Sequence, residues 1–181
     1  MKKRLFIGIP ITKGLYQKIA NLEDDIDKRL NWIPLKNLHL TILFLGNIDI
    51  NEIPEIIDMM DEVKIKYKEY FKKLNLKIKK IDYGPPGRKN MIWLYIEKDE
   101  KLDKIKKIFE DELEKRKIYF QREERDFLPH INLIRLKNKK NLGDIKKDLD
   151  WSLIFTEINL YESHLKKPFV EYEVIKTIEL I

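Results

Sequence analysis

The sequence predicts an α+β fold in which residues 1–181 form one bilobal domain, with two mainly antiparallel sheets, outer helices and a central cleft. Short strand patterns alternate with helical patterns along the chain. A strand–helix–strand order also occurs twice, each time ending in a strand that carries a histidine. Phe6 precedes His39 by 33 residues, and Trp93 precedes His130 by 37. This spacing indicates one supersecondary unit used twice about a pseudo-twofold axis, and no linker separates the halves.

In the first half of the chain, apolar periodicity distinguishes strands from helices. Continuous apolar runs bounded by turn residues indicate strands, and apolar residues that recur every three or four positions indicate helices. We expect Gly46 and Asn47 to end the strand that carries His39. In order, the predicted elements are a strand at Arg4–Ile11, a helix at Lys13–Leu30, a strand at Leu38–Leu45 and a helix at Pro54–Phe71.

The second half contains the strongest loop of the chain, "GPPGRKN" at Gly84–Asn90. A polar stretch with room for a helical turn follows later, at Lys137–Asp150. Around them the same patterns predict strands at Leu74–Tyr83, Met91–Glu97 and Ile118–Glu123, a helix around Leu102–Leu113, a loop that enters a strand over Asp126–Leu136, and final strands near Ser152–Tyr161 and Tyr172–Leu180.

Composition limits the class of protein. A hydrophobic fraction of 43% is typical of a globular chain, and no apolar run approaches the ~20 residues that span a bilayer. The absence of cysteine excludes disulfides and thiolate metal sites, which fits an intracellular, cytoplasmic protein. The net charge of +6 favours a phosphate-bearing partner. The many Lys/Glu pairs are equally typical of the solvated faces of a heat-adapted protein.

Two of the three histidines lie in apolar strands, each with a hydrogen-bonding side chain two residues later. His39 is followed by Thr41 and His130 by Asn132, and residues i and i+2 of a strand share a face. A single buried histidine is most often a core residue bonded to a backbone carbonyl. Two at matching places in a repeat instead favour a shared site in the cleft.

Such a pair suits acid–base chemistry on a phosphodiester. Two imidazoles can act as general base and general acid in one turnover, and the flanking donors can hold phosphoryl oxygens. Attack of water on a strained cyclic phosphodiester needs these parts and no metal. The sequence shows no His/carboxylate cluster at ligand spacing and no glycine-rich phosphate loop, so we expect neither a metal nor a cofactor.

At these residues the chain resembles a known family. "HLTI" at His39–Ile42 and "HINL" at His130–Leu133 resemble the paired H-x-T-x motifs of the two-histidine (2H) phosphoesterases. The resemblance extends over nearly the whole chain and is greatest to the LigT/ThpR branch, the RNA 2′,3′-cyclic phosphodiesterases once described as 2′–5′ RNA ligases. It includes "RLFIGIPI", "NWIPLKNLHLTILFLGN", "MIWLYIE", "RDFLPHINLIR" and "LYESHLKKPFVEYEVI".

The resemblance implies a bilobal fold and metal-independent hydrolysis of an RNA 2′,3′-cyclic phosphate to a 2′-phosphate. By position, His39 would protonate the leaving 3′-oxygen and His130 would activate water, although the direction of these roles stays open. Thr41 and Asn132 would bind phosphate oxygens. Arg135 matches an arginine that often closes the second motif and would contact the phosphate or nucleotide.

Two features depart from a simple transfer of the motif. Asn132 stands where the family usually has threonine, and an amide differs from a hydroxyl in length and geometry. Hydrolysis could therefore be slow, or the substrate different. Strand alternation places Arg135 opposite His130, so a bulge is needed to bring it into the cleft. Without one, Arg135 is a solvent-exposed or lobe-packing residue.

Four further side chains have weaker signals. Phe44 and Trp32 could stack on a base, but alternation places Phe44 on the face away from His39, in the core. His164 has no paired motif and is expected in an exposed turn. Arg88 lies in a loop from which it could reach RNA or remain solvated.

The predicted function is that of an RNA 2′,3′-cyclic phosphodiesterase, a monomer without membrane association that acts on RNA with a cyclic phosphate end. Reversible 2′–5′ RNA ligation also remains open. One alternative is the same chemistry on a small cyclic nucleotide or an ADP-ribose cyclic phosphate. A second, which Asn132 keeps open, is an RNA-end-binding module with weak catalysis.

Overall fold

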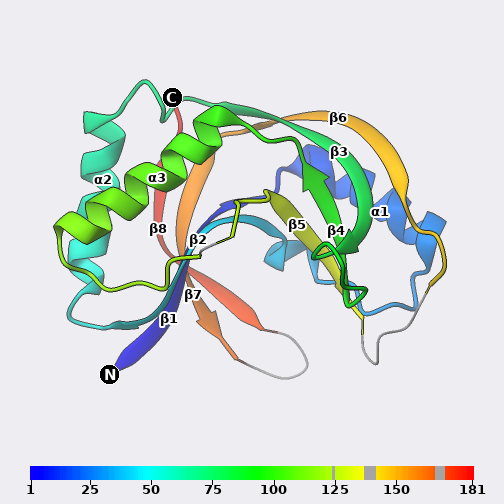
Figure 1. The fold of residues 1–181 in the computed structure, drawn as a ribbon, viewed down its shortest axis with the longest axis horizontal. Helices are drawn as coiled ribbons and strands as arrows, with labels where there is room; N and C mark the ends of the chain where they lie inside the picture. Colours follow the sequence, from blue (N-terminus) through cyan, green and yellow to red (C-terminus); the bar gives the residue numbers. More distant parts are fainter. Residues whose placement is uncertain (124, 137–141, 166–169) are drawn as a thin grey trace.

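The computed structural model describes residues 1–123, 125–136, 142–165 and 170–181. Within these residues, eight strands and three α-helices form an α+β fold (Figure 1). The strands are β1 (Lys2–Pro10), β2 (His39–Asp49), β3 (Leu74–Gly84), β4 (Met91–Ile96), β5 (His130–Arg135), β6 (Lys147–Phe155), β7 (Glu157–His164) and β8 (Glu171–Glu179). The helices are α1 (Lys13–Ile26), α2 (Ile53–Lys66) and α3 (Glu100–Lys115), with a short 3₁₀ turn at Leu35–Asn37.

All eight strands belong to one antiparallel sheet in the order β6-β3-β4-β5-β2-β1-β7-β8. The expectation of two separate sheets is therefore wrong. The physical reason is that β2 and β5, the two histidine-bearing strands, pair with each other at Leu40 and Ile131 and join the halves. The predicted units β1-α1-β2 and β4-α3-β5 lie on opposite sides of this junction. A pseudo-twofold relation between them stays a prediction.

The helices connect the two halves of the sheet. α1 follows β1, yet it packs against β6 in the other half, where Lys18 lies over the Trp151 ring and Asp25 pairs with Lys147. α3 leads into β5, yet it contacts α2 and β2. Figure 1 shows α1 on one side of the molecule and the α2–α3 pair on the other. Each unit's helix thus covers strands of the opposite half.

The buried face of α1 matches the apolar periodicity of its sequence. On α1 the buried residues are Leu15, Ile19 and Leu22, which are part of the periodic set expected from the sequence. Full burial of each such side chain stabilises the fold by about 1.5–3 kcal/mol. No described helix combines the length and apolar character needed to cross a membrane.

Several predicted boundaries differ from the structure. α1 ends at Ile26 rather than Leu30, because Asp27 takes an extended backbone conformation and its carboxylate binds Arg29. α2 ends at Lys66, before the predicted Phe71. Residues 118–123 form no strand, and the single strand expected over 152–161 is the end of β6 and the start of β7. Of the polar stretch 137–150, residues 137–141 lie outside the described residues, and β6 already begins at Lys147.

β2 continues past Gly46 to Asp49, so the expected strand end was also wrong. Leu5 pairs with Gly46 and Phe6 with Phe44, which leaves one extra residue on β2 between them. Gly46 has a φ of 78°, a conformation that a side chain disfavours and that β-bulges use. The glycine marks a bulge within the strand.

Candidate functional site

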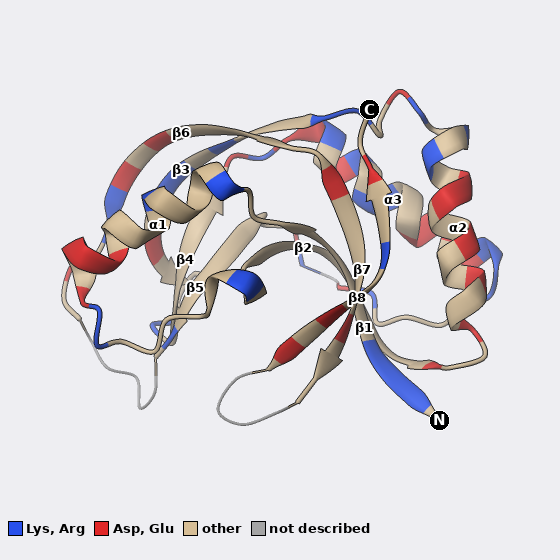
Figure 2. Cartoon of the chain, turned by 180° about the vertical axis from the view of Figure 1, so that it is seen from behind, with Lys and Arg blue, Asp and Glu red and all other residues tan. Residues whose placement is uncertain are grey.

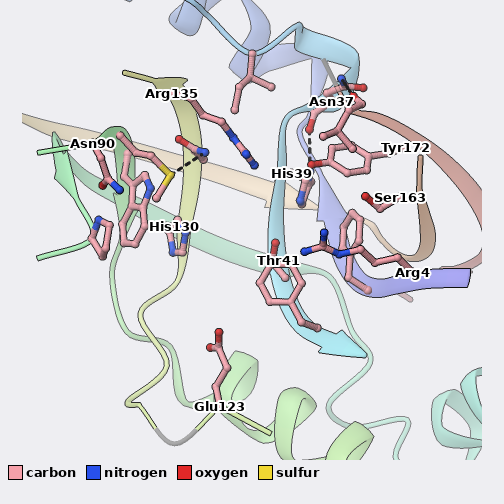
Figure 3. Close-up of a pocket in the computed structure, with 18 of the residues that line it drawn as sticks. Arg4, Asn37, His39, Thr41, Asn90, Glu123, His130, Arg135, Ser163 and Tyr172 are labelled. Atoms are coloured by element: carbon pink, nitrogen blue, oxygen red, sulfur yellow. Dashed lines mark hydrogen bonds between the residues drawn. The ribbon is translucent and has the colours of Figure 1, made fainter. Parts of the chain in front are cut away.

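One pocket of about 420 Å³ lies where β2 and β5 meet, and all five side chains predicted for the site line it. These are His39, Thr41, His130, Asn132 and Arg135 (Figure 3). The volume is within the range that encloses a small ligand. The two motifs, separated by about half the chain, therefore face one cavity.

The two imidazoles are held in the same way. His39 Nδ1 lies 2.7 Å from the carbonyl oxygen of Asn37, and His130 Nδ1 lies 2.7 Å from that of Leu128. A carbonyl only accepts hydrogen bonds, so each Nδ1 carries the proton and donates. The Nε2 atom of each neutral ring is then left with a lone pair for a ligand or a reacting water.

An aromatic ring from the neighbouring strand packs against each histidine. The Phe6 ring centroid lies 4.7 Å from that of His39, and Trp93 stacks on His130 at 3.5 Å with 14° between the planes. Tyr172 meets His39 edge-on at 4.9 Å. Phe6 and Trp93 were recognised from the sequence only as markers of the repeat, and their matched spacing was the signal that could have assigned them to the site.

Burial among these rings disfavours the charged imidazolium. It lowers the pKa of His39 from 6.5 to about 4, and the positive charge of Arg135 adds a smaller effect in the same direction. Burial also lowers the pKa of His130. Both histidines are therefore neutral at pH 7 in the free protein.

A bulge in β5 brings Arg135 into the pocket. The pairing of β5 with β4 skips Leu133, between the paired residues Asn132 and Ile134. One extra residue reverses the alternation of faces. Arg135 consequently lies on the same side as His130, as the sequence required for a role in the cleft.

β2 contains a bulge of the same kind, and the expectation that Phe44 faces the core was wrong. Its pairing with β1 skips Ile42, between the paired residues Thr41 and Leu43. Phe44 therefore faces the pocket beside His39 rather than the core, and its side chain is 44% exposed.

Unsatisfied polar atoms gather on the β4–β5 side of the pocket. The amide NH₂ of Asn132 donates to Met91 Sδ at 3.3 Å, a weak acceptor, while its Oδ1 is buried without a partner. Asn90 Oδ1 and Trp93 Nε1 are also buried without partners among the described residues. A buried polar atom without a partner costs about 1–3 kcal/mol, so this wall is poised to bind a polar ligand.

The pocket also gathers arginines that lack acidic partners. The chain has seven arginines, all within the described residues. Three of them pair with acids elsewhere, namely Arg29, Arg116 and Arg122. The other four line the pocket and make no ion pair with any acid in the described part of the chain: Arg4, Arg88, Arg125 and Arg135. Glu123 is the one acid on the described pocket wall, so the cavity favours an anion.

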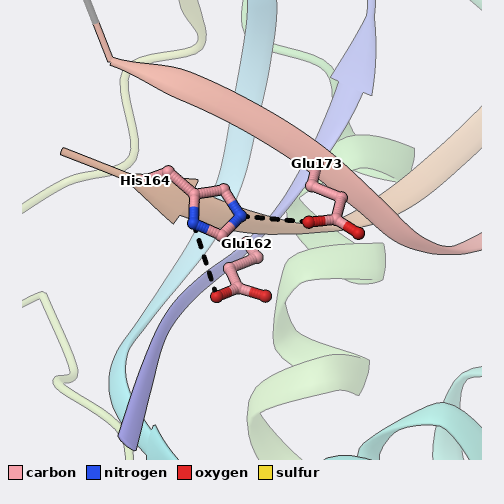
Figure 4. Close-up of side chains that lie close together, drawn as sticks. All are labelled: Glu162, His164 and Glu173. Atoms are coloured by element: carbon pink, nitrogen blue, oxygen red, sulfur yellow. Dashed lines mark hydrogen bonds and ion pairs between the residues drawn. The ribbon is translucent and has the colours of Figure 1, made fainter. Parts of the chain in front are cut away.

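Two other residues considered from the sequence lie outside the pocket. The Trp32 indole donates to the backbone oxygen of Asp27. His164 is on β7 rather than in a turn, and its ring lies between Glu162 and Glu173 (Figure 4). These three residues form a His/carboxylate group that sequence spacing did not predict, because Glu173 comes from another strand. Lys3 pairs with Glu162 at 2.5 Å, so one carboxylate of the group already has a cationic partner.

A family profile described as "AKAP7 2′5′ RNA ligase-like domain" matches residues 6–180. The chain belongs to this family, the LigT-like 2H phosphoesterases. Among its relatives in the family is the RNA 2′,3′-cyclic phosphodiesterase of Methanocaldococcus jannaschii, 29% identical over 184 residues that cover 96% of this chain and 98% of the relative. A Thermotoga maritima protein of the same name is 24% identical over 95% of this chain and 92% of its own length.

Two solved structures have the same fold. E. coli LigT complexed with 3′-AMP matches with a TM-score of 0.78 and 19% identity, covering 99% of each chain. A Thermus thermophilus protein matches with a TM-score of 0.80 and 19% identity, covering 98% of this chain and 97% of its own. At this identity the likeness establishes the fold.

Proposed function

We propose that this 2H phosphoesterase hydrolyses the 2′,3′-cyclic phosphate at the end of an RNA to a 2′-phosphate, without a metal. The observation that carries the proposal is the pair of imidazoles in one pocket, each bonded through Nδ1 to a backbone carbonyl. Its curated relatives bear the name of this activity, which supports the choice of substrate.

In the proposed reaction, water attacks the phosphorus while Nε2 of His130 accepts its proton. The bond between phosphorus and the 3′-oxygen breaks, and protonated His39 gives its Nε2 proton to that oxygen. The products are a 2′-phosphate monoester, a free 3′-hydroxyl, neutral His39 and protonated His130. Exchange of protons with solvent restores the starting state.

His39 must be charged to act as the acid, yet its pKa is low in the free protein. The bound phosphodiester supplies a negative charge beside the ring, and an opposite charge raises the pKa of an imidazole. Binding of the substrate therefore favours the protonated form of His39, which acts as the acid.

A substrate with sulfur in place of the 3′-oxygen tests this assignment, because a thiolate leaves without a proton. His39→Ala should hydrolyse this substrate far better than the oxygen substrate. His130→Ala should not.

Thr41, Asn132 and Arg135 would hold the non-bridging oxygens of the phosphate. The hydroxyl and the amide supply neutral donors, and a guanidinium can bind two oxygens at once. The Asn132 amide has only a sulfur acceptor to give up. Removal of one such donor costs about 10²–10³ in rate in other enzymes.

Incubation of the protein with EDTA and an RNA oligomer that ends in a 2′,3′-cyclic phosphate tests the proposal. We expect a 2′-phosphate product that disappears in His39→Ala and in His130→Ala. His164→Ala is the matched control, because it removes the remaining histidine outside the pocket. Tight binding of the RNA end without turnover would instead favour an end-binding module. Better turnover of a cyclic mononucleotide or an ADP-ribose cyclic phosphate would favour a small-molecule enzyme.

A further inference from the structure

A second, more open hollow of about 1400 Å³ adjoins the pocket of the histidines. We call it the β1 groove. The start of β1, residues 119, 121–123 and 125, and the ends of β2 and β7 form its walls. Arg4, Phe44 and Arg125 line both the pocket and the groove, so the two spaces are continuous. A ligand bound at the histidines can extend into the groove without crossing a wall.

The groove is basic where it meets the pocket. Arg4 and Arg125 have no acidic partner in the described residues, whereas Arg122 at its rim is held 3.0 Å from Glu114. Of the two acids on its described wall, Glu162 is already paired with Lys3, whereas Glu123 lines both the groove and the pocket and makes no ion pair with a described residue. Figure 2 shows the start of β1 as a continuous basic segment. Two guanidinium groups without an acidic partner, against the single carboxylate of Glu123, therefore lie where the groove meets the pocket of the histidines.

An exposed aromatic side chain adds a second kind of contact. Tyr119 lines the groove with 85% of its surface exposed. A ring in such a place offers a stacking surface for a nucleobase, and stacking of this kind tolerates any base. Guanidinium groups beside an aromatic ring are the combination by which single-stranded nucleic acid is bound without reading its sequence.

A cyclic mononucleotide leaves this groove unused. Its single phosphate is the reacting one, which Thr41, Asn132 and Arg135 hold in the proposed function. In an RNA strand, each preceding nucleotide adds one bridging phosphate on the 5′ side of the cyclic end. We propose that the β1 groove binds the nucleotides preceding the cyclic end, with Arg4 and Arg125 on their phosphates and Tyr119 against a base. The proposal rests on the proposed function and makes the substrate an oligonucleotide.

The test compares kcat/KM for a 2′,3′-cyclic mononucleotide, the corresponding di- and trinucleotides, and ADP-ribose 1″,2″-cyclic phosphate. We expect kcat/KM to rise with chain length through a lower KM. Arg125→Gln and Arg4→Gln should each reduce the advantage of the trinucleotide over the mononucleotide by about five- to tenfold. The log–log dependence of trinucleotide binding on salt should become shallower by about 0.7 for each phosphate that no longer meets a guanidinium. Arg29→Gln, which removes an arginine outside both spaces, should change neither quantity.

Equal kcat/KM for the mononucleotide and the trinucleotide would overturn the groove proposal. An ADP-ribose cyclic phosphate used as well as the trinucleotide would do the same, as would an unchanged length preference in both arginine variants. Failure of every cyclic phosphate to react is a different result and refutes the proposed function. In that event, binding of a fluorescent 2′-phosphorylated trinucleotide, compared with the mononucleotide, still tests the groove.

Discussion

Phe44 occupies on β2 the place that Arg135 occupies on β5. Each lies five residues after a pocket histidine, and each reaches the pocket through a single extra residue in its strand. One site of the pair presents an apolar ring and the other a guanidinium. The two halves of the pocket therefore share a backbone plan and differ in the chemistry they offer.

Replacement of Arg135 should change the titration of His39. Burial is the main cause of the low pKa of His39, and the charges of His130 and Arg135 lower it further, so Arg135→Gln should raise that pKa a little above about 4. An NMR titration of the His39 imidazole measures the change. Arg88→Gln, an arginine of the same pocket without this effect on His39, is the control. A rise of equal size in both variants would show that the contribution beyond burial comes from the general charge of the pocket rather than from Arg135.

Asn132→Leu should separate activity from stability. The change removes a donor to the substrate, and we expect kcat/KM to fall about 10²–10³-fold. It also removes the buried Oδ1 atom that has no partner, so the free energy of unfolding should rise, by up to about 1–3 kcal/mol. Kinetics and urea unfolding measure the two effects, and Asn132→Thr, which keeps a hydroxyl donor, should retain turnover. Loss of stability in Asn132→Leu would mean that the amide is structurally required.

Gly84→Ala should displace the ring that supports His130. A Cβ at this position would overlap the Trp93 side chain, and Trp93 stacks on His130. We expect lower stability and reduced turnover, with a change in Trp fluorescence. Gly14→Ala provides the control, because a Cβ there meets nothing closer than 3.9 Å, and we expect it to leave stability and turnover unchanged. Wild-type behaviour of Gly84→Ala would show that the ring can shift at no cost.

Acid should destabilise the protein through its buried neutral histidines. Between pH 6.5 and about 4, the unfolded chain binds a proton at residue 39 that the folded chain does not. The free energy of unfolding therefore decreases as the pH is lowered through this window. The gap between the two pKa values corresponds to about 3 kcal/mol, of which about 2 kcal/mol is lost by pH 5. Urea unfolding at pH 7 and pH 5 should show a smaller loss in His39→Gln, and equal losses in both proteins would contradict the prediction.

The sequence predicted most of the strands, the three helices and the His39–Thr41 and His130–Asn132 pairs because their signals are local, whereas Arg135 was expected only from the family resemblance. Periodicity marks a stripe such as Leu15 and Ile19, and the i, i+2 rule places Thr41 beside His39. What it missed depends on contacts between distant segments. The bulge that turns Phe44 inward is a property of the pairing with β1, and Tyr172 reaches His39 from the far end of the chain. The junction of two predicted sheets into one likewise requires β2 and β5 to meet.

The crossed placement of α1 and α3 determines how the cleft can move. β2 and β5 share a single paired position, Leu40 with Ile131, which alone would make a weak seam along which the molecule could open. Because each unit's helix contacts strands of the opposite half, opening that seam would also break these helix contacts. We therefore expect the scaffold, rather than a movement of the two halves, to set the separation of the two imidazoles.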